Sequence, residues 1–156
     1  MRRFKQLAIA VATIGGLGRI PVAPGTAGSA VGLAIGIVLA RTLSWPIALS
    51  ILVATFVACA LTCTMAEREI GQHDPSAVIL DEVWAMAAII VVLPWVAVSG
   101  FLLLLAFLCF RFFDIAKPPP LKRLATLPRG WGIIADDLGA AAYTAAILWI
   151  ASRAFG

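Results

Sequence analysis

The chain alternates long apolar stretches with short segments that are charged or rich in glycine and proline. Together with their flanking turns, five of these stretches are long enough to predict membrane-crossing helices, at residues 29–43, 46–66, 77–95, 96–113 and 133–155. Residues 7–17 are too short to span, and we predict an interfacial or re-entrant helix there, with Arg2, Arg3 and Lys5 as its basic anchor. The pattern therefore predicts an all-α polytopic membrane protein that forms a single domain over residues 1–156.

The composition favours a lipid environment for most of the chain. Hydrophobic residues make up 62% of it and charged residues only 13%, whereas about a quarter of an ordinary soluble domain is charged. So few polar residues cannot cover the surface of a soluble protein of this size. The three cysteines all lie inside apolar stretches, so we expect buried free thiols. No basic run with interleaved aromatic residues occurs in the sequence, so a nucleic-acid partner is not expected.

Small residues recur at a helical spacing in the first predicted span. Gly28, Gly32 and Gly36 are four residues apart and therefore lie on one face of a helix. This small-xxx-small pattern is typical of helices whose backbones approach a neighbouring helix closely. We expect this face to pack against another helix.

The positions of lysine and arginine predict the orientation in the membrane. With a cytoplasmic N-terminus, five spans place most basic residues on the cytoplasmic side, namely Arg2, Arg3, Lys5, Arg19, Arg68, Arg111, Lys117, Lys122, Arg123 and Arg129. Only Arg41 and Arg153 fall on the other side, so the positive-inside rule favours this topology. The same topology places every acidic residue on the cytoplasmic side, and we expect the working face of the protein there.

Five carboxylates stand where the predicted spans begin or end, and helix length places them near headgroup depth: Asp81, Glu82, Asp114, Asp136 and Asp137. Helix capping would explain one acidic pair, but ionised groups next to hydrocarbon are costly and are usually functional. Two unit charges 4 Å apart repel by roughly 4 kcal/mol at an effective dielectric constant of about 20. If the five converge, Arg111 and Lys117 offset part of this charge, and a hard cation such as Mg²⁺ would offset more.

A glycine- and proline-rich segment, residues 21–29, is a second candidate site. Thr26 and Ser29 offer hydroxyl groups, and a helix that begins near Ser29 would present free N–H groups to an anion. The alternative is a plain turn with a serine cap, which we favour on this segment alone. His73 reads as a solvated loop residue, and Asp74 as a cap for the helix that follows Pro75.

Four segments, taken together and in order, resemble the bacterial phosphatidylglycerophosphatase A family: PVAPGTAGS at 21–29, DPSAVILDEVWA at 74–85, FRFFDIAKPPP at 110–120 and GWGIIADD at 130–137. This family removes the terminal phosphate of phosphatidylglycerophosphate, gives phosphatidylglycerol, and depends on Mg²⁺. The resemblance implies an enzyme of the bacterial cytoplasmic (inner) membrane. It implies functional importance for Asp81, Glu82, Arg111, Asp114, Lys117, Asp136 and Asp137, and it also implicates Thr26, Gly28 and Ser29.

We therefore expect a Mg²⁺-dependent lipid phosphatase whose active site faces the cytoplasm. The expected metal ligands are Asp81, Glu82, Asp114, Asp136 and Asp137, with Asp114 as a further ligand or a general base. Asp81, Glu82, Asp114 and Asp137 are the expected catalytic residues. Thr26, Ser29, Arg111 and Lys117 are expected to bind the substrate phosphate.

Other functions stay open at this point. One is a phosphatase of another lipid phosphate, such as phosphatidic acid. A small transporter with a carboxylate-lined path would need acidic residues at several depths, and here they share one depth. A catalytically silent assembly subunit would not need five carboxylates beside an arginine and a lysine. The number of metal ions, and whether the chain works as a monomer or a homo-oligomer, are left undecided by the sequence.

Overall fold

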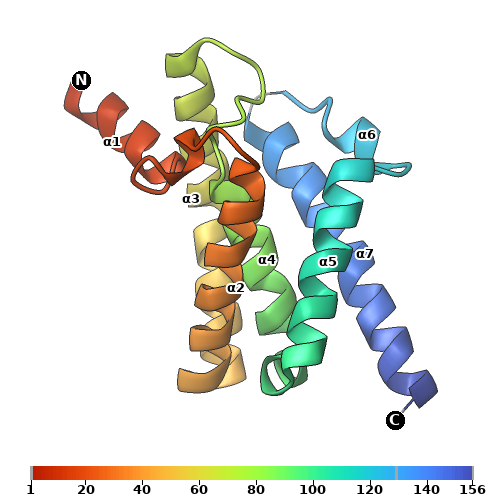
Figure 1. Ribbon diagram of the computed structural model, residues 1–156. Coiled ribbons are helices and arrows are strands. Elements are labelled where there is room, and N and C mark those ends of the chain that lie inside the picture. The colour runs from red at the N-terminus through yellow and green to blue at the C-terminus, as the bar shows by residue number, and fades with distance from the viewer. Residues whose placement is uncertain (1, 129, 156) are drawn as a thin grey trace.

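The computed structural model describes residues 2–128 and 130–155, and every regular element in these residues is helical (Figure 1). The elements are α1 (Arg2–Ala12), the 3₁₀ helix η1 (Leu17–Arg19), α2 (Pro24–Thr42), α3 (Trp45–Ile70), α4 (Leu80–Val92), the 3₁₀ helix η2 (Pro94–Val98), α5 (Gly100–Ala116), α6 (Leu121–Leu124) and α7 (Gly130–Phe155). The predicted all-α class is confirmed. Arg129, which the topology assigns to the cytoplasmic side, lies outside the described residues.

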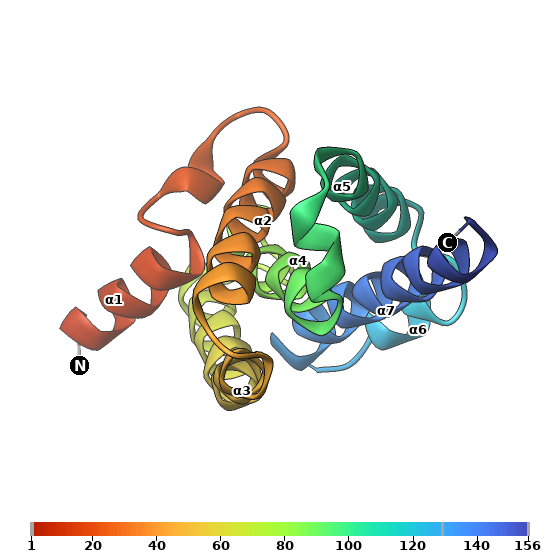
Figure 2. The ribbon, with the colours of Figure 1, turned by 90° about the horizontal axis from the view of Figure 1, so that it is seen from below.

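The long helices α2, α3, α4, α5 and α7 run side by side along the molecule, and α4 lies between the others (Figures 1 and 2). Three described helices, α2, α3 and α7, are long and apolar enough to cross a membrane. The helices α4, with 13 residues, and α5, with 17, are shorter. Pro94 explains why α4 ends early, because the residue before a proline is disfavoured in a helix. Length and composition alone therefore identify three of the five expected spans.

Several predicted helix boundaries were wrong. The helix α2 begins at Pro24 and not near Ser29, because proline suits the first helical position, where no N–H group is needed. The helix α3 continues to Ile70, four residues beyond the predicted end of the span 46–66. Gly71 ends it in the left-handed conformation (φ 75°). The helix α7 begins at Gly130 and not at residue 133, so Asp136 and Asp137 lie in its second turn and not near its start.

The glycine face of α2 packs directly against α4, as the small-residue spacing predicted. A Cβ atom on Gly28 would meet Ile79, one on Gly32 would meet the backbone of Val83, and one on Gly36 would meet Ile90. These contacts let the two backbones approach closely. They bring the first turn of α4 next to the first turns of α2.

Replacing Gly32 by alanine is expected to lower the free energy of unfolding by about 1–3 kcal/mol, because the added methyl group overlaps the α4 backbone. The measurement is an unfolding titration of the purified protein in mixed micelles. Gly100→Ala is the matched control, because a Cβ atom at Gly100 would have no neighbour within 4 Å. Equal unfolding free energies for the two variants would contradict the role of Gly32 in packing.

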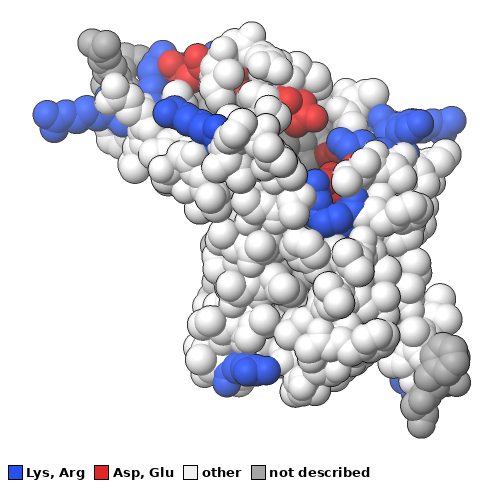
Figure 3. Space-filling view, in the orientation of Figure 1, with Lys and Arg blue, Asp and Glu red and all other residues white. Residues whose placement is uncertain are grey.

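The charged side chains gather at one end of the molecule, where α1 and α6 lie, and the opposite end shows few (Figure 3). Arg41 and Arg153 stand in the last turns of α2 and α7. The helix α1 lies across the charged end and packs on α3 through Ala12, while Lys5 pairs with Glu69 at 2.7 Å. Its outer side leaves Phe4 73% exposed and Leu7 59% exposed.

Candidate active site

A cavity of about 240 Å³ opens at the charged end between α2, α4, α5 and α7, where the space-filling view shows a hollow that contains both acidic and basic side chains (Figure 3). Its polar lining residues are Asp74, Ser76, Asp81, Glu82, Arg111, Asp114, Lys117, Asp136 and Asp137. All five carboxylates singled out in the sequence therefore converge on one space. Six carboxyl groups and two cationic side chains share this lining, so acidic groups outnumber basic ones.

Three of the carboxylates form a cluster in which oxygen atoms lie within 4.8 Å of one another: Asp81 and Glu82 from the first turn of α4, and Asp137 from α7. Asp81 is 5% exposed and Asp137 is 3% exposed. Each of the three has one buried oxygen (Asp81 Oδ1, Glu82 Oε2 and Asp137 Oδ2) that has no hydrogen-bond partner within the described parts of the chain. Buried polar atoms are normally paired, and clustered carboxylate oxygens are the ligands that Mg²⁺ prefers. The three residues therefore fit a divalent cation.

The other two carboxylates are engaged by cations. Arg111 Nη1 lies 2.7 Å from Asp114 Oδ2, one turn along α5, and also donates to Ser29 Oγ at 3.3 Å. Lys117 follows the last residue of α5 and forms an ion pair with Asp136 of α7. Burial lowers the pKa of the Lys117 ammonium group, but the hydrogen bond and the attraction from Asp136 outweigh this and raise the pKa above its ordinary value. Lys117 is therefore a cation at neutral pH.

The hydroxyl groups expected to bind phosphate lie within α2. Ser29 is fully buried, and its hydroxyl donates to the Gly25 carbonyl at 2.9 Å while it accepts the bond from Arg111. Free N–H groups were expected at a helix start near Ser29, but α2 already begins at Pro24, and the Thr26 N–H group donates to the Ala23 carbonyl at 3.0 Å. The α2 residues that line the cavity are Pro24 and Gly25, preceded by Ala23. In the described structure Ser29 thus supports Arg111, and Thr26 is not part of the cavity lining.

Backbone strain is concentrated around this cavity. Four described residues other than glycine have a positive φ angle, and three of them line the cavity: Ala23 (φ 48°), Asp74 (φ 47°) and Lys117 (φ 43°). Non-glycine residues in this conformation cost about 1–3 kcal/mol each and cluster at functional sites. The strain is therefore independent support for the cavity as the functional site.

Residues 10–152 match the protein-family model described as "Phosphatidylglycerophosphatase A". The chain belongs to this family. The phosphatidylglycerophosphatase A of Haemophilus influenzae is 33% identical over 86% of this chain and 82% of its own length. A "Putative phosphatidylinositol-3-phosphatase" of Bacteroides thetaiotaomicron is 28% identical over the full length of both chains. No solved structure matches the chain significantly.

Membership of the phosphatidylglycerophosphatase A family confirms the resemblance drawn from the four segments. It also confirms the prediction of an enzyme of the phosphatidylglycerophosphatase class, a phosphoric monoester hydrolase. The cavity gives this family member what phosphate chemistry needs at one place: clustered carboxylates, an arginine and a lysine. Because the family is one of lipid phosphatases, a phospholipid is the substrate class and the membrane is where the enzyme acts.

Asp74 and Ser76, which were not predicted as site residues, line the cavity from the loop between α3 and α4. Asp74 does not cap α4, because Ile79 occupies the cap position. One signal was available, since Asp74 belongs to the same family segment, residues 74–85, as Asp81 and Glu82. His73, expected to be solvated, contacts Glu67 with 2.5 Å between Nδ1 and Oε1. This contact ties the loop to the end of α3.

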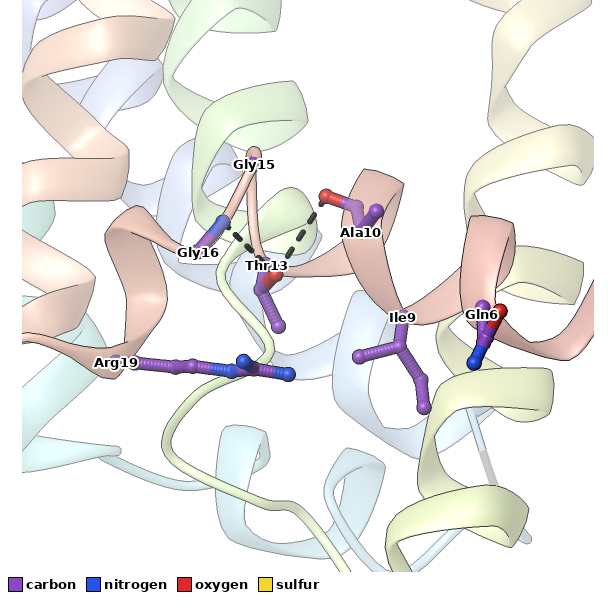
Figure 4. Close-up of a pocket in the computed structure, with 7 residues that line it drawn as sticks. All are labelled: Gln6, Ile9, Ala10, Thr13, Gly15, Gly16 and Arg19. Carbon is purple, nitrogen blue, oxygen red and sulfur yellow. Dashed lines mark hydrogen bonds between the residues drawn. The ribbon is translucent and has the colours of Figure 1, made fainter.

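A second cavity of about 230 Å³ lies in the turn between α1 and η1 (Figure 4). Arg19 and Gln6 reach toward it from opposite sides, and the Thr13 hydroxyl accepts a hydrogen bond from the Gly16 N–H group at 3.1 Å. Its lining, as far as the described residues define it, contains no carboxylate. It therefore offers no negatively charged ligand for a hard cation, and the carboxylate cavity is the better candidate for the reaction.

Proposed function

We propose that the enzyme hydrolyses the terminal phosphate of phosphatidylglycerophosphate, with Mg²⁺ as cofactor, and releases phosphatidylglycerol and phosphate at the cytoplasmic face of the membrane. One observation carries this proposal. The unpartnered carboxylate oxygens of Asp81, Glu82 and Asp137 share a cavity with the cations Arg111 and Lys117. Carboxylates suit a metal ion and the two cations suit a phosphoryl group, so the cavity offers a metal site and a phosphate-binding site side by side.

Each side chain then has a defined task. Asp81, Glu82 and Asp137 would hold Mg²⁺, which when bound supplies positive charge to the phosphoryl oxygens and activates water. Arg111 and Lys117 would bind the non-bridging phosphoryl oxygens and stabilise the charge that builds up on them during the reaction. Asp114 and Asp136, which the sequence analysis placed among the metal ligands, would instead hold these two cations in position.

We place the five long helices across the bacterial inner membrane with the charged end in the cytoplasm. The positive-inside rule supports this orientation, as does the gathering of charged side chains at one end (Figure 3). The helix α1 would lie in the membrane interface, with Phe4 and Leu7 facing lipid. The phosphate would then reach the cavity while the acyl chains of the substrate stay in the bilayer.

The direct test is phosphate release from phosphatidylglycerophosphate by the purified protein in detergent. Release is expected with Mg²⁺, is expected to stop when EDTA is added, and should return with excess Mg²⁺. No release under any of these conditions would overturn the proposed substrate. Release that EDTA leaves unchanged would overturn the proposed cofactor.

The Bacteroides relative favours a second candidate, hydrolysis of phosphatidylinositol 3-phosphate. The same assay with that lipid, and with phosphatidic acid, compares the three substrates directly. A kcat/KM that is highest for phosphatidylglycerophosphate supports the first proposal. A higher value for either other lipid would replace it.

A further inference from the structure

Asp74 lines the cavity but has no task in the roles proposed above. It comes from the loop between α3 and α4, is exposed, and lies outside the cluster of Asp81, Glu82 and Asp137. It shares the lining of this cavity with Lys117 and Asp136, which form an ion pair. Asp74 therefore lies near the cation that faces the phosphate, on the water-exposed side of the cavity.

The loop holds Asp74 there from both sides. Before it, His73 contacts Glu67, which is 8% exposed at the end of α3. After it, the Ile79 N–H group donates to the Ala12 carbonyl at 2.9 Å. Between these ties Asp74 keeps its left-handed backbone (φ 47°), a conformation that costs free energy in a residue other than glycine. The fold thus fixes a carboxylate at the mouth of the cavity.

A carboxylate beside a phosphate-binding cation is unfavourable for a bare phosphate, because the two negative groups repel each other. A hydroxyl group on the substrate changes this balance. It can donate a hydrogen bond to the carboxylate, and hydrogen bonds to charged groups are among the stronger ones in proteins. A phosphate monoester with a free hydroxyl on the neighbouring carbon therefore suits this mouth. Phosphatidic acid does not, since its neighbouring carbon is acylated.

We propose that Asp74 is a specificity-determining residue that accepts a hydrogen bond from the hydroxyl group next to the scissile phosphate ester. This inference rests on the proposed function and extends it to the alcohol part of the substrate. The ligand class is a polyol phosphate headgroup, such as glycerol phosphate. Ser76 lines the cavity from the same loop and offers a second hydrogen-bonding group there.

The test compares two enzymes on two substrates. The enzymes are wild type and Asp74→Ala, and the substrates are phosphatidylglycerophosphate and an analogue whose headgroup hydroxyl is replaced by hydrogen. Wild type is expected to prefer the natural lipid by about 10- to 100-fold in kcat/KM. Asp74→Ala should lose about this factor on the natural lipid and little on the analogue, so that the preference nearly disappears. Such a cycle isolates the contact between Asp74 and the hydroxyl.

Each other result has a defined meaning. An equal loss on both substrates, or no loss on either, overturns the role of Asp74 in reading the hydroxyl. No release of phosphate from the natural lipid by wild type instead overturns the proposed function. Glu69→Ala is the matched control, because this acid also lies near the charged end but pairs with Lys5 outside the cavity. It should leave both rates unchanged.

A second variant covers the case in which alanine disturbs the strained loop. Asparagine tolerates the left-handed conformation, so Asp74→Asn should unfold at the wild-type temperature. Its neutral amide oxygen accepts a weaker hydrogen bond than a carboxylate. We expect a preference between those of wild type and Asp74→Ala, and a wild-type preference in a folded Asp74→Asn would overturn the need for the charge.

Discussion

Replacing Asp137 by asparagine is expected to lower kcat for phosphate release by about a thousandfold or more, while the protein stays folded. Asp137 is 3% exposed and shares its cluster with Asp81 and Glu82. Losing one of three carboxylate ligands weakens Mg²⁺ binding, and metal ions supply several kcal/mol of charge stabilisation in such reactions. The measurement is phosphate release from the lipid at a Mg²⁺ concentration about 100 times the dissociation constant of wild type. Asp81→Asn should behave in the same way.

Stability separates this effect from unfolding. Without Mg²⁺, Asp137→Asn is expected to be at least as stable as wild type, because it removes one of three buried carboxylates that repel each other. With Mg²⁺ at about 100 times its dissociation constant, wild type should gain about 2.7 kcal/mol and the variant far less. Glu69→Gln, outside the cavity, serves as the control for both measurements. Phosphate release by Asp137→Asn at the wild-type rate would contradict the proposed active site.

The sequence allowed the class of fold and the packing face of α2 to be predicted, because both depend on local patterns. A run of apolar residues needs no partner to be recognised, and the spacing of Gly28, Gly32 and Gly36 fixes a helix face. The start of α2 was harder. Pro24 at the first helical position was a local signal for it, but the left-handed backbone of Ala23 (φ 48°), which precedes the helix, leaves no trace in periodicity.

In the candidate site, too, local spacing was predictable and long-range contacts were not. Arg111 and Asp114 are three residues apart, a spacing that places two residues on one face of a helix, and they form an ion pair at 2.7 Å. Lys117 has the same spacing on the other side of Asp114 but pairs with Asp136. The helix α5 ends at Ala116, and the left-handed backbone of Lys117 (φ 43°) takes this residue out of the helix. Which carboxylates bind cations, and which stay unpaired, depends on such long-range contacts.

Arg111→Ala is expected to lower kcat about 100- to 1,000-fold, the usual loss when one donor to the charge of the transition state is removed. The guanidinium group is well placed for this role. Its side chain is 16% exposed, it lines the cavity, and Asp114 and Ser29 fix it in place. Arg111→Lys keeps the charge but loses the planar fork that matches a phosphoryl group, so an intermediate loss is expected. The measurement is kcat for phosphate release at saturating Mg²⁺, with Arg123→Ala on the exposed surface of α6 as the control.

Removing Arg111 alone also leaves Asp114, whose side chain is 13% exposed, without its cation. The protein is expected to lose less than the about 3–5 kcal/mol that breaking a fully buried pair costs. The double variant Arg111→Ala/Asp114→Ala removes both partners and should recover most of that unfolding free energy. Its activity should stay as low as that of Arg111→Ala, because the donor to the phosphoryl group is still missing. Recovery of activity together with stability would show that Arg111 serves only the fold. Recovery of stability alone assigns Arg111 to the reaction, with Asp114 as the residue that positions it.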